Sequence, residues 1–312
     1  MKADESESKP KKPEEPSDDG LTEVVPPPAK TPLYQATHAL RYQRQALIKK
    51  IEERTGHQLI CYIAGIEAPI ERDDVVAFVD LLHNVQPDRD LDLMLHTPGG
   101  DGDAAEKLIS LARKKVGKGA LRVVVPDYAK SAGTLMALGA DAVCMSDSSE
   151  LGPIDPQVVR SDQSGNRAQF SVQCYLDAYD DHTAALQKNP NDVAAQIMLG
   201  QLDPATVKRY QAVRDRARVL AEDLLKRGMF RNGGNWSKTA GELLDTKRWQ
   251  SHAQMISYED AQVLGLTIEP LDADSQDWQD YWQLYCLQRL AISDRQKLFE
   301  SNYASLVIDS TL

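Results

Sequence analysis

Residues 91–156, LDLMLHTPGGDGDAAEKLISLARKKVGKGALRVVVPDYAKSAGTLMALGADAVCMSDSSELGPIDP, contain the pattern that decides the fold. Short apolar runs, typical of buried strands, alternate here with segments of helical periodicity. Such alternation predicts β-α-β crossovers and a mainly parallel sheet. We expect four neighbouring strands in this sheet, covered by helices, at residues 59–64, 91–96, 121–125 and 142–145.

Two turns in this stretch carry the candidate chemistry. In the first, residues 97–100 (TPGG), Gly99 and Gly100 can adopt conformations that point successive N–H groups at one negatively charged oxygen. In the second, residues 129–134 (AKSAGT), Ser131 lies at a strand-to-helix junction beside small residues that let a substrate approach. A serine hydroxyl needs a general base and oxyanion donors to act as a nucleophile. Each turn alone is more often only a turn or a helix cap. Together, at the carboxyl ends of adjacent strands, they would share one crevice.

Composition narrows the class of protein. With 312 residues, 42% of them hydrophobic and 27% charged, the chain fits one or two globular domains. The formal net charge of −11 argues against a nucleic-acid-binding surface. The four cysteines form neither a zinc pattern nor a disulfide framework, which suits a reducing compartment. Because residues 1–20 have no apolar stretch and no run of about 18 apolar residues occurs, we expect no signal peptide, no membrane span and a cytoplasmic location.

The sequence divides into three regions. Residues 1–31 are rich in Lys, Glu, Asp, Ser and Pro, and we expect a disordered acidic, Pro-rich tail. Residues 32–270 hold the strand–helix alternation and form the predicted main domain, including a long helix over 204–227. Residues 271–312 are predicted to be a helical C-terminal extension, with an aromatic stripe over 278–285 that suits packing or an oligomer contact.

Three segments, TPGGDGDAAEKL, VPDYAKSAGTLMALGAD and ELGPIDPQ, resemble the serine dehydrogenase proteinase family. That family belongs with signal peptide peptidase A and the proteolytic subunit of Clp protease in the crotonase-like superfamily. The resemblance covers roughly residues 57–157, with a weaker echo at 256–266. It implies an α/β, crotonase/Clp-protease-like fold of repeated β-β-α/β-α units with a mainly parallel sheet. It also implies a homo-oligomer and no metal or organic cofactor.

The resemblance assigns roles to individual residues. Ser131 matches the nucleophile of the family's small-residue helix. Gly99 and Gly100 match the oxyanion loop, and the N–H of Ala132 would be a further oxyanion donor. The segment 151–156 matches the loop that closes the crevice.

The general base departs from the familiar pattern. Clp-type peptidases carry a His in the segment that corresponds to Pro156, and no His lies near it here. Two substitutes remain: His252, close to where Clp-type domains carry their acidic member, and Lys188, about where some signal-peptide-peptidase-like enzymes bring a Lys. A desolvated lysine can act as a base. We favour His252 over Lys188. Asp155 is either a catalytic carboxylate or, more commonly before a proline, a turn cap.

These features predict a serine hydrolase, a peptidase that cleaves a peptide or protein substrate through an acyl-enzyme and uses no ATP by itself. The alternative is a catalytically silent Clp/crotonase-fold protein that binds peptides or acts as a scaffold. A third function, acyl-CoA chemistry, does not need the serine of the AKSAGT helix and is disfavoured. Reactivity of Ser131 towards a fluorophosphonate distinguishes the first two, and binding to immobilised CoA tests the third.

Overall fold

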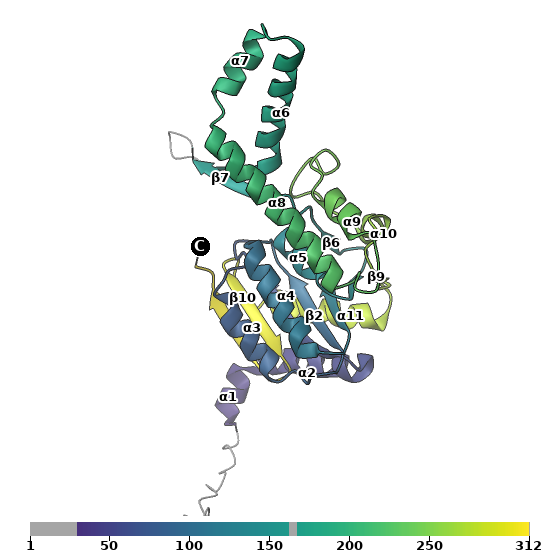
Figure 1. The fold of residues 1–312 in the computed structure, drawn as a ribbon. Coiled ribbons are helices and arrows are strands. Elements are labelled where there is room, and N and C mark those ends of the chain that lie inside the picture. Colours follow the sequence, from purple (N-terminus) through teal and green to yellow (C-terminus); the bar gives the residue numbers. More distant parts are fainter. Residues whose placement is uncertain (1–29, 162–166, 312) are drawn as a thin grey trace, which may run out of the picture. The chain divides into compact units, whose positions relative to one another are not determined.

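The computed structural model describes residues 30–161 and 167–311 (Figure 1). The chain forms two units, residues 1–39 and 40–312. The described part of the first unit holds a short helix, α1 (Pro32–Thr37), whose first turn is capped by the Thr31 hydroxyl. The predicted tail, residues 1–31, lies outside the described residues except for its last two. Within the described part of the chain, no helix combines the length and the apolar character needed to cross a membrane.

A seven-stranded sheet is the framework of the second unit. From edge to edge its strands run in the order β11, β10, β1, β2, β3, β5 and β9. Their bounds are β1 (Gln58–Ala64), β2 (Leu91–His96), β3 (Leu121–Val125), β5 (Ala142–Met145), β9 (Ile268–Pro270), β10 (Gln296–Ser301) and β11 (Ser305–Asp309). Within this sheet β1, β2, β3, β5 and β9 are parallel to one another, whereas β10 runs antiparallel to both of its neighbours, β1 and β11. The four predicted strands are therefore neighbours, and the predicted α/β class with a mainly parallel sheet is confirmed.

Helices cover both faces of this sheet (Figure 1). The helices that follow α1 in the described part of the chain, not all of which pack on the sheet, are α2 (Ala39–Thr55), α3 (Asp74–His83), α4 (Gly102–Val116), α5 (Ala132–Leu138), α6 (Val172–Lys188), α7 (Val193–Gly200), α8 (Pro204–Arg227), α9 (Trp236–Leu243), α10 (Tyr258–Val263) and α11 (Gln276–Arg289). Two small ladders complete the fold: β4 (Tyr128–Ala129) with β6 (Glu150–Leu151), and β7 (Gln157–Ser161) with β8 (Arg167–Ser171).

The core has two layers because neighbouring side chains of a strand point to opposite faces of the sheet. In β1, Ile60 and Tyr62 belong to the larger core, which includes residues of α3, α4, α5 and α8. Leu59, Cys61 and Ile63 belong to the second core, with residues of α2 and α11. Burial on both faces explains why the parallel strands appear in the sequence as continuous apolar runs.

The C-terminal region differs from the expected helical extension. Residues 271–312 hold one helix, α11, followed by β10 and β11, which extend the main sheet. The sequence QKLFES of β10 does not have the apolar pattern of a buried strand, because it includes the charged residues Lys297 and Glu300. Both residues are nevertheless buried. Lys297 Nζ donates to Glu71 at 2.7 Å, and Arg44 pairs with Glu300 at 2.9 Å. Pairing offsets the cost of burying these charges.

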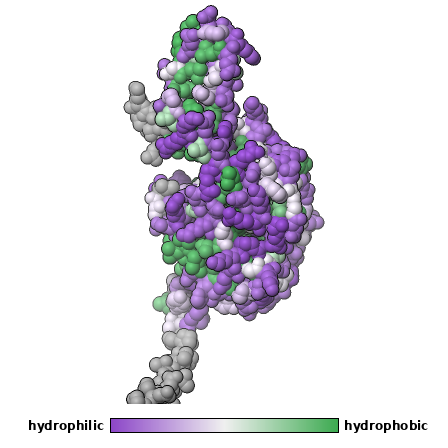
Figure 2. Space-filling model, in the orientation of Figure 1, coloured by the Kyte–Doolittle hydropathy of each residue, from purple (hydrophilic) through white to green (hydrophobic). Residues whose placement is uncertain are grey.

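Helices α6 and α7 and the first part of α8 form a group outside the sheet layers (Figure 1). A small core of Val172, Leu176 and Val207 joins α6 to α8. Hydrophobic surface lies over this group (Figure 2), and α7 exposes Val193 and Ile197. Helix α8 spans the residues predicted for it, 204–227, and continues from this group onto the main core.

Candidate active site

The two candidate turns meet beyond the carboxyl ends of β2 and β3. The Thr97 N–H donates to the Tyr128 carbonyl at 3.0 Å, and the Lys130 N–H donates to the Thr97 carbonyl at 3.1 Å. These bonds place TPGG beside AKSAGT, as expected for turns that follow adjacent parallel strands. The close approach explains a small residue after Ala132, because a Cβ on Gly133 would lie 2.5 Å from Thr97 Cγ2.

Ser131 has a strained backbone. It precedes α5 with φ 52° and ψ −110°, and its side chain does not cap the helix. For a residue that has a Cβ, such a conformation costs about 1–3 kcal/mol and persists only with support from its surroundings. A serine held at a strained strand-to-helix turn, with its hydroxyl not used as a cap, is typical of a nucleophile.

The candidate oxyanion donors differ in whether they are already bonded. The Gly99 N–H donates to Thr97 Oγ1 at 3.2 Å, so it already has an acceptor. Gly100, at φ 140°, lies against Ile70, whose N–H donates to the Gly99 carbonyl at 2.7 Å. Across residues 30–161 and 167–311, the N–H groups of Gly100 and Ala132 have no protein acceptor. Both N–H groups are therefore available to donate to an oxyanion.

His252 is oriented by a buried carboxylate. Its Nδ1–H donates to Asp155 Oδ1 at 2.7 Å. Asp155 is 4% exposed, and its loop is held by a bond from the Ile154 N–H to the Leu243 carbonyl at 3.1 Å. Because a carboxylate only accepts hydrogen bonds, this contact assigns the ring proton to Nδ1 and leaves the Nε2 lone pair available. That is the state in which a histidine acts as a general base.

A cavity of about 500 Å³ brings Ser131 and His252 to one space. Gly100 and Ala132 line the same cavity. Within the described residues no hydrogen bond joins Ser131 to His252, and such contacts are often long before a substrate binds. An adjoining cavity of about 550 Å³ shares His252 and Gln157 with the first, so the open space continues past the imidazole.

A polar cluster supports the end of β2 beneath the TPGG turn. The buried His96 donates from Nδ1–H to the Ala64 carbonyl at 2.9 Å, and its Nε2 lies 3.3 Å from the Asp127 carboxylate. Burial alone would raise the pKa of Asp127, but His96 and Tyr285 hold that pKa below its usual range. Burial and the Asp127 carboxylate together raise the pKa of Tyr285. The cluster connects β2 to the segment before Ser131 and serves the structure of the turns.

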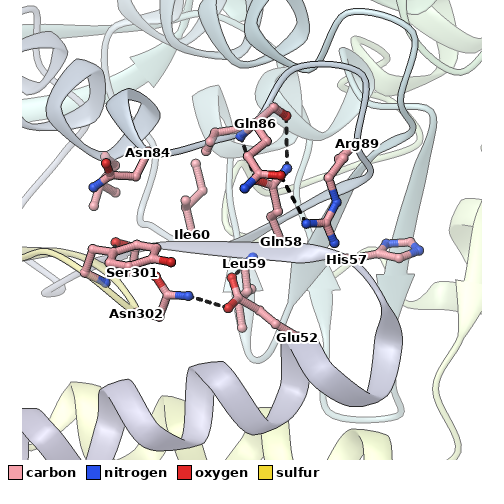
Figure 3. Close-up of a pocket in the computed structure, with 13 residues that line it drawn as sticks. Glu52, His57, Gln58, Leu59, Ile60, Asn84, Gln86, Arg89, Ser301 and Asn302 are labelled. Atoms are coloured by element: carbon pink, nitrogen blue, oxygen red, sulfur yellow. Dashed lines mark hydrogen bonds between the residues drawn. The ribbon is translucent and has the colours of Figure 1, made fainter.

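A smaller cavity, of about 140 Å³, lies at the amino end of β1 (Figure 3). Its polar groups bond to one another: the Gln86 N–H donates to Gln58 Oε1 at 2.6 Å, and the Leu59 N–H donates to Glu52 at 2.9 Å. Burial raises the pKa of Glu52. Ligand sites in parallel sheets lie at the carboxyl ends of the strands. We therefore assign no chemistry to this cavity.

The sequence of the chain matches a known protein family. The model of the ClpP-like SDH-type serine proteinase family matches residues 31–270. The chain belongs to this family. The matched region includes both turns, the loop of Asp155 and His252, and it confirms the resemblance drawn from three short segments of the sequence.

Two curated relatives match part of the chain. The uncharacterized protein MJ1495 of Methanocaldococcus jannaschii is 33% identical over 153 residues, which cover 45% of this chain and 49% of the relative. The uncharacterized protein MJ0137 of the same organism is 28% identical over 182 residues, which cover 58% of this chain and 54% of the relative. The chain thus spans about half the length of the curated relatives it matches.

Two solved structures are similar to the chain. A mutant of the 1510-N membrane-bound stomatin-specific protease has a TM-score of 0.41 and 16% identity, covering 70% of this chain and 82% of that one. A second mutant of that protease, in complex with a substrate peptide, has a TM-score of 0.38 and 15% identity, covering 73% of this chain and 99% of that one.

The structure places the two base candidates differently. His252 lines the cavity that contains Ser131, whereas Lys188 does not line it. Lys188 is the last residue of α6, where its side chain is exposed. An exposed lysine lacks the desolvation that lets an amine act as a base near neutral pH. The geometry therefore favours His252.

The structure shows contacts at the site for two residues, Asp155 and Lys130, that the sequence alone did not indicate. Asp155, for which a turn cap was the more common role, accepts a hydrogen bond from His252. Its sequence signal is its place, next to the Pro156 segment where Clp-type peptidases carry their histidine. Lys130 directly precedes Ser131 and is paired with Glu150. Nothing in the sequence pattern of AKSAGT indicates that pairing.

Proposed function

We propose that this chain is a serine peptidase in which Ser131 is the nucleophile and His252 is the general base, oriented by Asp155. One observation carries the proposal: Ser131 and His252 line one cavity, and His252 donates from Nδ1–H to the buried Asp155 at 2.7 Å. Membership of a serine proteinase family supports the same reading.

The proposed reaction proceeds through an acyl-enzyme. His252 Nε2 takes the proton from Ser131 Oγ as that oxygen attacks the scissile carbonyl carbon. The carbonyl oxygen becomes an oxyanion and accepts hydrogen bonds from the Gly100 and Ala132 N–H groups. His252 then gives its proton to the leaving amine, and the C–N bond breaks. A water molecule, deprotonated by His252, hydrolyses the ester and restores the Ser131 hydroxyl.

The lining of the cavity indicates the class of substrate side chain. The cavity that contains Ser131 is lined in part by apolar residues, Leu135, Ile154, Val213, Ala217 and Leu220, and in part by polar ones that include Asp101, Asp103 and Arg216. The apolar part of the lining favours an apolar substrate side chain next to the scissile bond. We therefore expect cleavage within unfolded protein segments, where such side chains are accessible.

Hydrolysis of an unstructured protein tests the proposed function. We expect the full chain to cleave β-casein, with apolar residues enriched at the new carboxyl ends in mass spectra of the products. Treatment with a fluorophosphonate should stop the cleavage. A chain that binds β-casein but never cleaves it, and whose serines do not react with the fluorophosphonate, would instead be a silent peptide-binding protein.

Gly100→Val is expected to lower the rate of fluorophosphonate labelling by about 10²-fold or more, the usual effect of displacing an oxyanion donor. A Cβ on Gly100 would lie 2.4 Å from the Ile70 carbonyl oxygen and 2.5 Å from the Ile70 nitrogen. The loop must shift to relieve these contacts, and the Gly100 N–H moves with it. The matched control is Gly200→Val, because a Cβ on Gly200 has no neighbour within 4 Å. Equal labelling rates for Gly100→Val and the unaltered chain would remove Gly100 from the site.

A further inference from the structure

Lys130 extends from the residue before Ser131 to two other segments of the candidate site. Its side chain is 14% exposed, and its Nζ donates to Glu150 at 2.6 Å. It also donates to the Leu151 carbonyl at 3.1 Å. The carbonyls of Gln254 and Ala253 accept from the same nitrogen at 3.4 and 3.5 Å. One ammonium group therefore contacts two separate parts of the chain.

Each of these parts carries a member of the proposed site. Glu150 and Leu151 belong to the strand that leads into the loop of Asp155, and Ala253 directly follows His252. Each partner of Nζ is an acceptor, so the nitrogen donates in every contact. Lys130 therefore serves here to hold two segments of the site against the turn of Ser131.

The aliphatic part of the Lys130 side chain, its stem, is closely packed. A Cβ on Gly152 would lie 2.8 Å from Lys130 Cδ, so the stem lies directly against the loop of Asp155. The loops of Asp155 and His252 are also joined by the bond between these two side chains, at 2.7 Å, and by the backbone pair between Leu151 and Ile256, at 3.0 and 3.1 Å. Thr134 Oγ1 also connects the turn of Ser131 to the loop of Asp155, through Gly152 at 2.9 and 3.0 Å. In the described part of the chain, Lys130 provides the hydrogen bonds from this turn to the loop of His252.

We propose that Lys130 is a positioning residue, whose ammonium sets the spacing between Ser131 and His252. The inference rests on the proposed function. A displacement of about 1 Å between reacting groups can cost about 10²-fold in rate. Loss of the ammonium would free the loop of His252 and leave the Glu150 carboxylate without its partner, while the cavity walls that bind a ligand would stay in place.

The test uses a fluorophosphonate with the full chain and separates kinact, the rate constant at saturating probe, from KI, the concentration for half that rate. For Lys130→Met we expect kinact to fall by about 10- to 100-fold, with KI and the unfolding temperature little changed. Lys114→Met removes an exposed lysine of α4 and should leave both constants unaltered. Aminoethylation of Lys130→Cys with bromoethylamine rebuilds an ammonium of lysine length and should restore kinact, relative to an unaltered chain treated in the same way.

The outcomes separate this inference from the proposed function. Labelling of Lys130→Met at the unaltered rate would overturn the positioning role and leave the proposed peptidase intact. A loss that aminoethylation does not reverse would also overturn it. If Lys130→Met does not fold, Glu150→Gln replaces it, with an expected loss of about tenfold in kinact because a charge-assisted bond is weakened. Unchanged kinact in that variant would equally overturn the role. If the unaltered chain never labels at Ser131, the proposed function fails and this inference fails with it.

Discussion

His252→Ala is expected to lower kcat for β-casein cleavage by about 10⁶-fold, the scale seen when one member of a catalytic triad is removed. Without the imidazole, the proposed acceptor of the Ser131 Oγ proton is lost. His252 lies in a loop and its side chain is 25% exposed, so little packing is lost and the fold should be retained. Initial rates of cleavage and of fluorophosphonate labelling, with the unfolding temperature as a check, measure the effect.

Lys188→Ala is the matched control, because Lys188 was the competing base candidate and is exposed at the end of α6. We expect this variant to label and cleave at the unaltered rate. The reverse pattern, with activity lost in Lys188→Ala and kept in His252→Ala, would transfer the role of base to Lys188. Full activity in both variants would contradict the proposed base altogether.

Asp155→Asn is expected to lower kcat by about 10⁴-fold while the geometry of the site is retained. An asparagine that presents its amide N–H to His252 Nδ1 forces the ring proton onto Nε2, where the lone pair is needed. The volume of the side chain hardly changes, so binding of the substrate and folding should be preserved. The measurement is kcat and KM for cleavage, with the loss expected in kcat.

Asp177→Asn serves as the control for Asp155→Asn. Asp177 lines the cavity that adjoins the site, together with Asp155, but its carboxylate accepts a hydrogen bond from Gln173 and not from His252. Its substitution should leave kcat unchanged. Similar losses in both variants would mean that the charge of the cavity matters and that the contact between Asp155 and His252 does not.

The parts of the fold that could be predicted are those with a local signal. The strands β1, β2, β3 and β5 are buried on both faces, so each appears as an apolar run that the sequence displays directly. The strand β10 was missed because Lys297 and Glu300 interrupt its apolar pattern. Their partners, Glu71 and Arg44, come from distant parts of the chain, and no local pattern announces such pairs.

Some residues of the candidate site likewise have a local signal in the sequence, and others do not. Ser131 and Gly100 lie in short turns whose residue types carry the signal at one place in the sequence. His252 and Asp155 are 97 residues apart, and only folding brings them to 2.7 Å. The Clp-type pattern pointed to both segments of the sequence, but the residue types are exchanged between them. Here Asp155 lies near Pro156, where Clp-type peptidases carry their histidine, and His252 lies close to where they carry their acidic residue. That exchange explains why Asp155 was first interpreted as a turn cap.

The central claim, that Ser131 is an activated nucleophile, is tested most directly by locating a fluorophosphonate adduct. The full chain is incubated with the probe, digested, and the modified residue is identified by tandem mass spectrometry. The account predicts one adduct, on Ser131, formed rapidly in the unaltered chain and absent after prior heat denaturation. An adduct on another serine, or no adduct on the folded chain under conditions that label a known serine hydrolase, would contradict it.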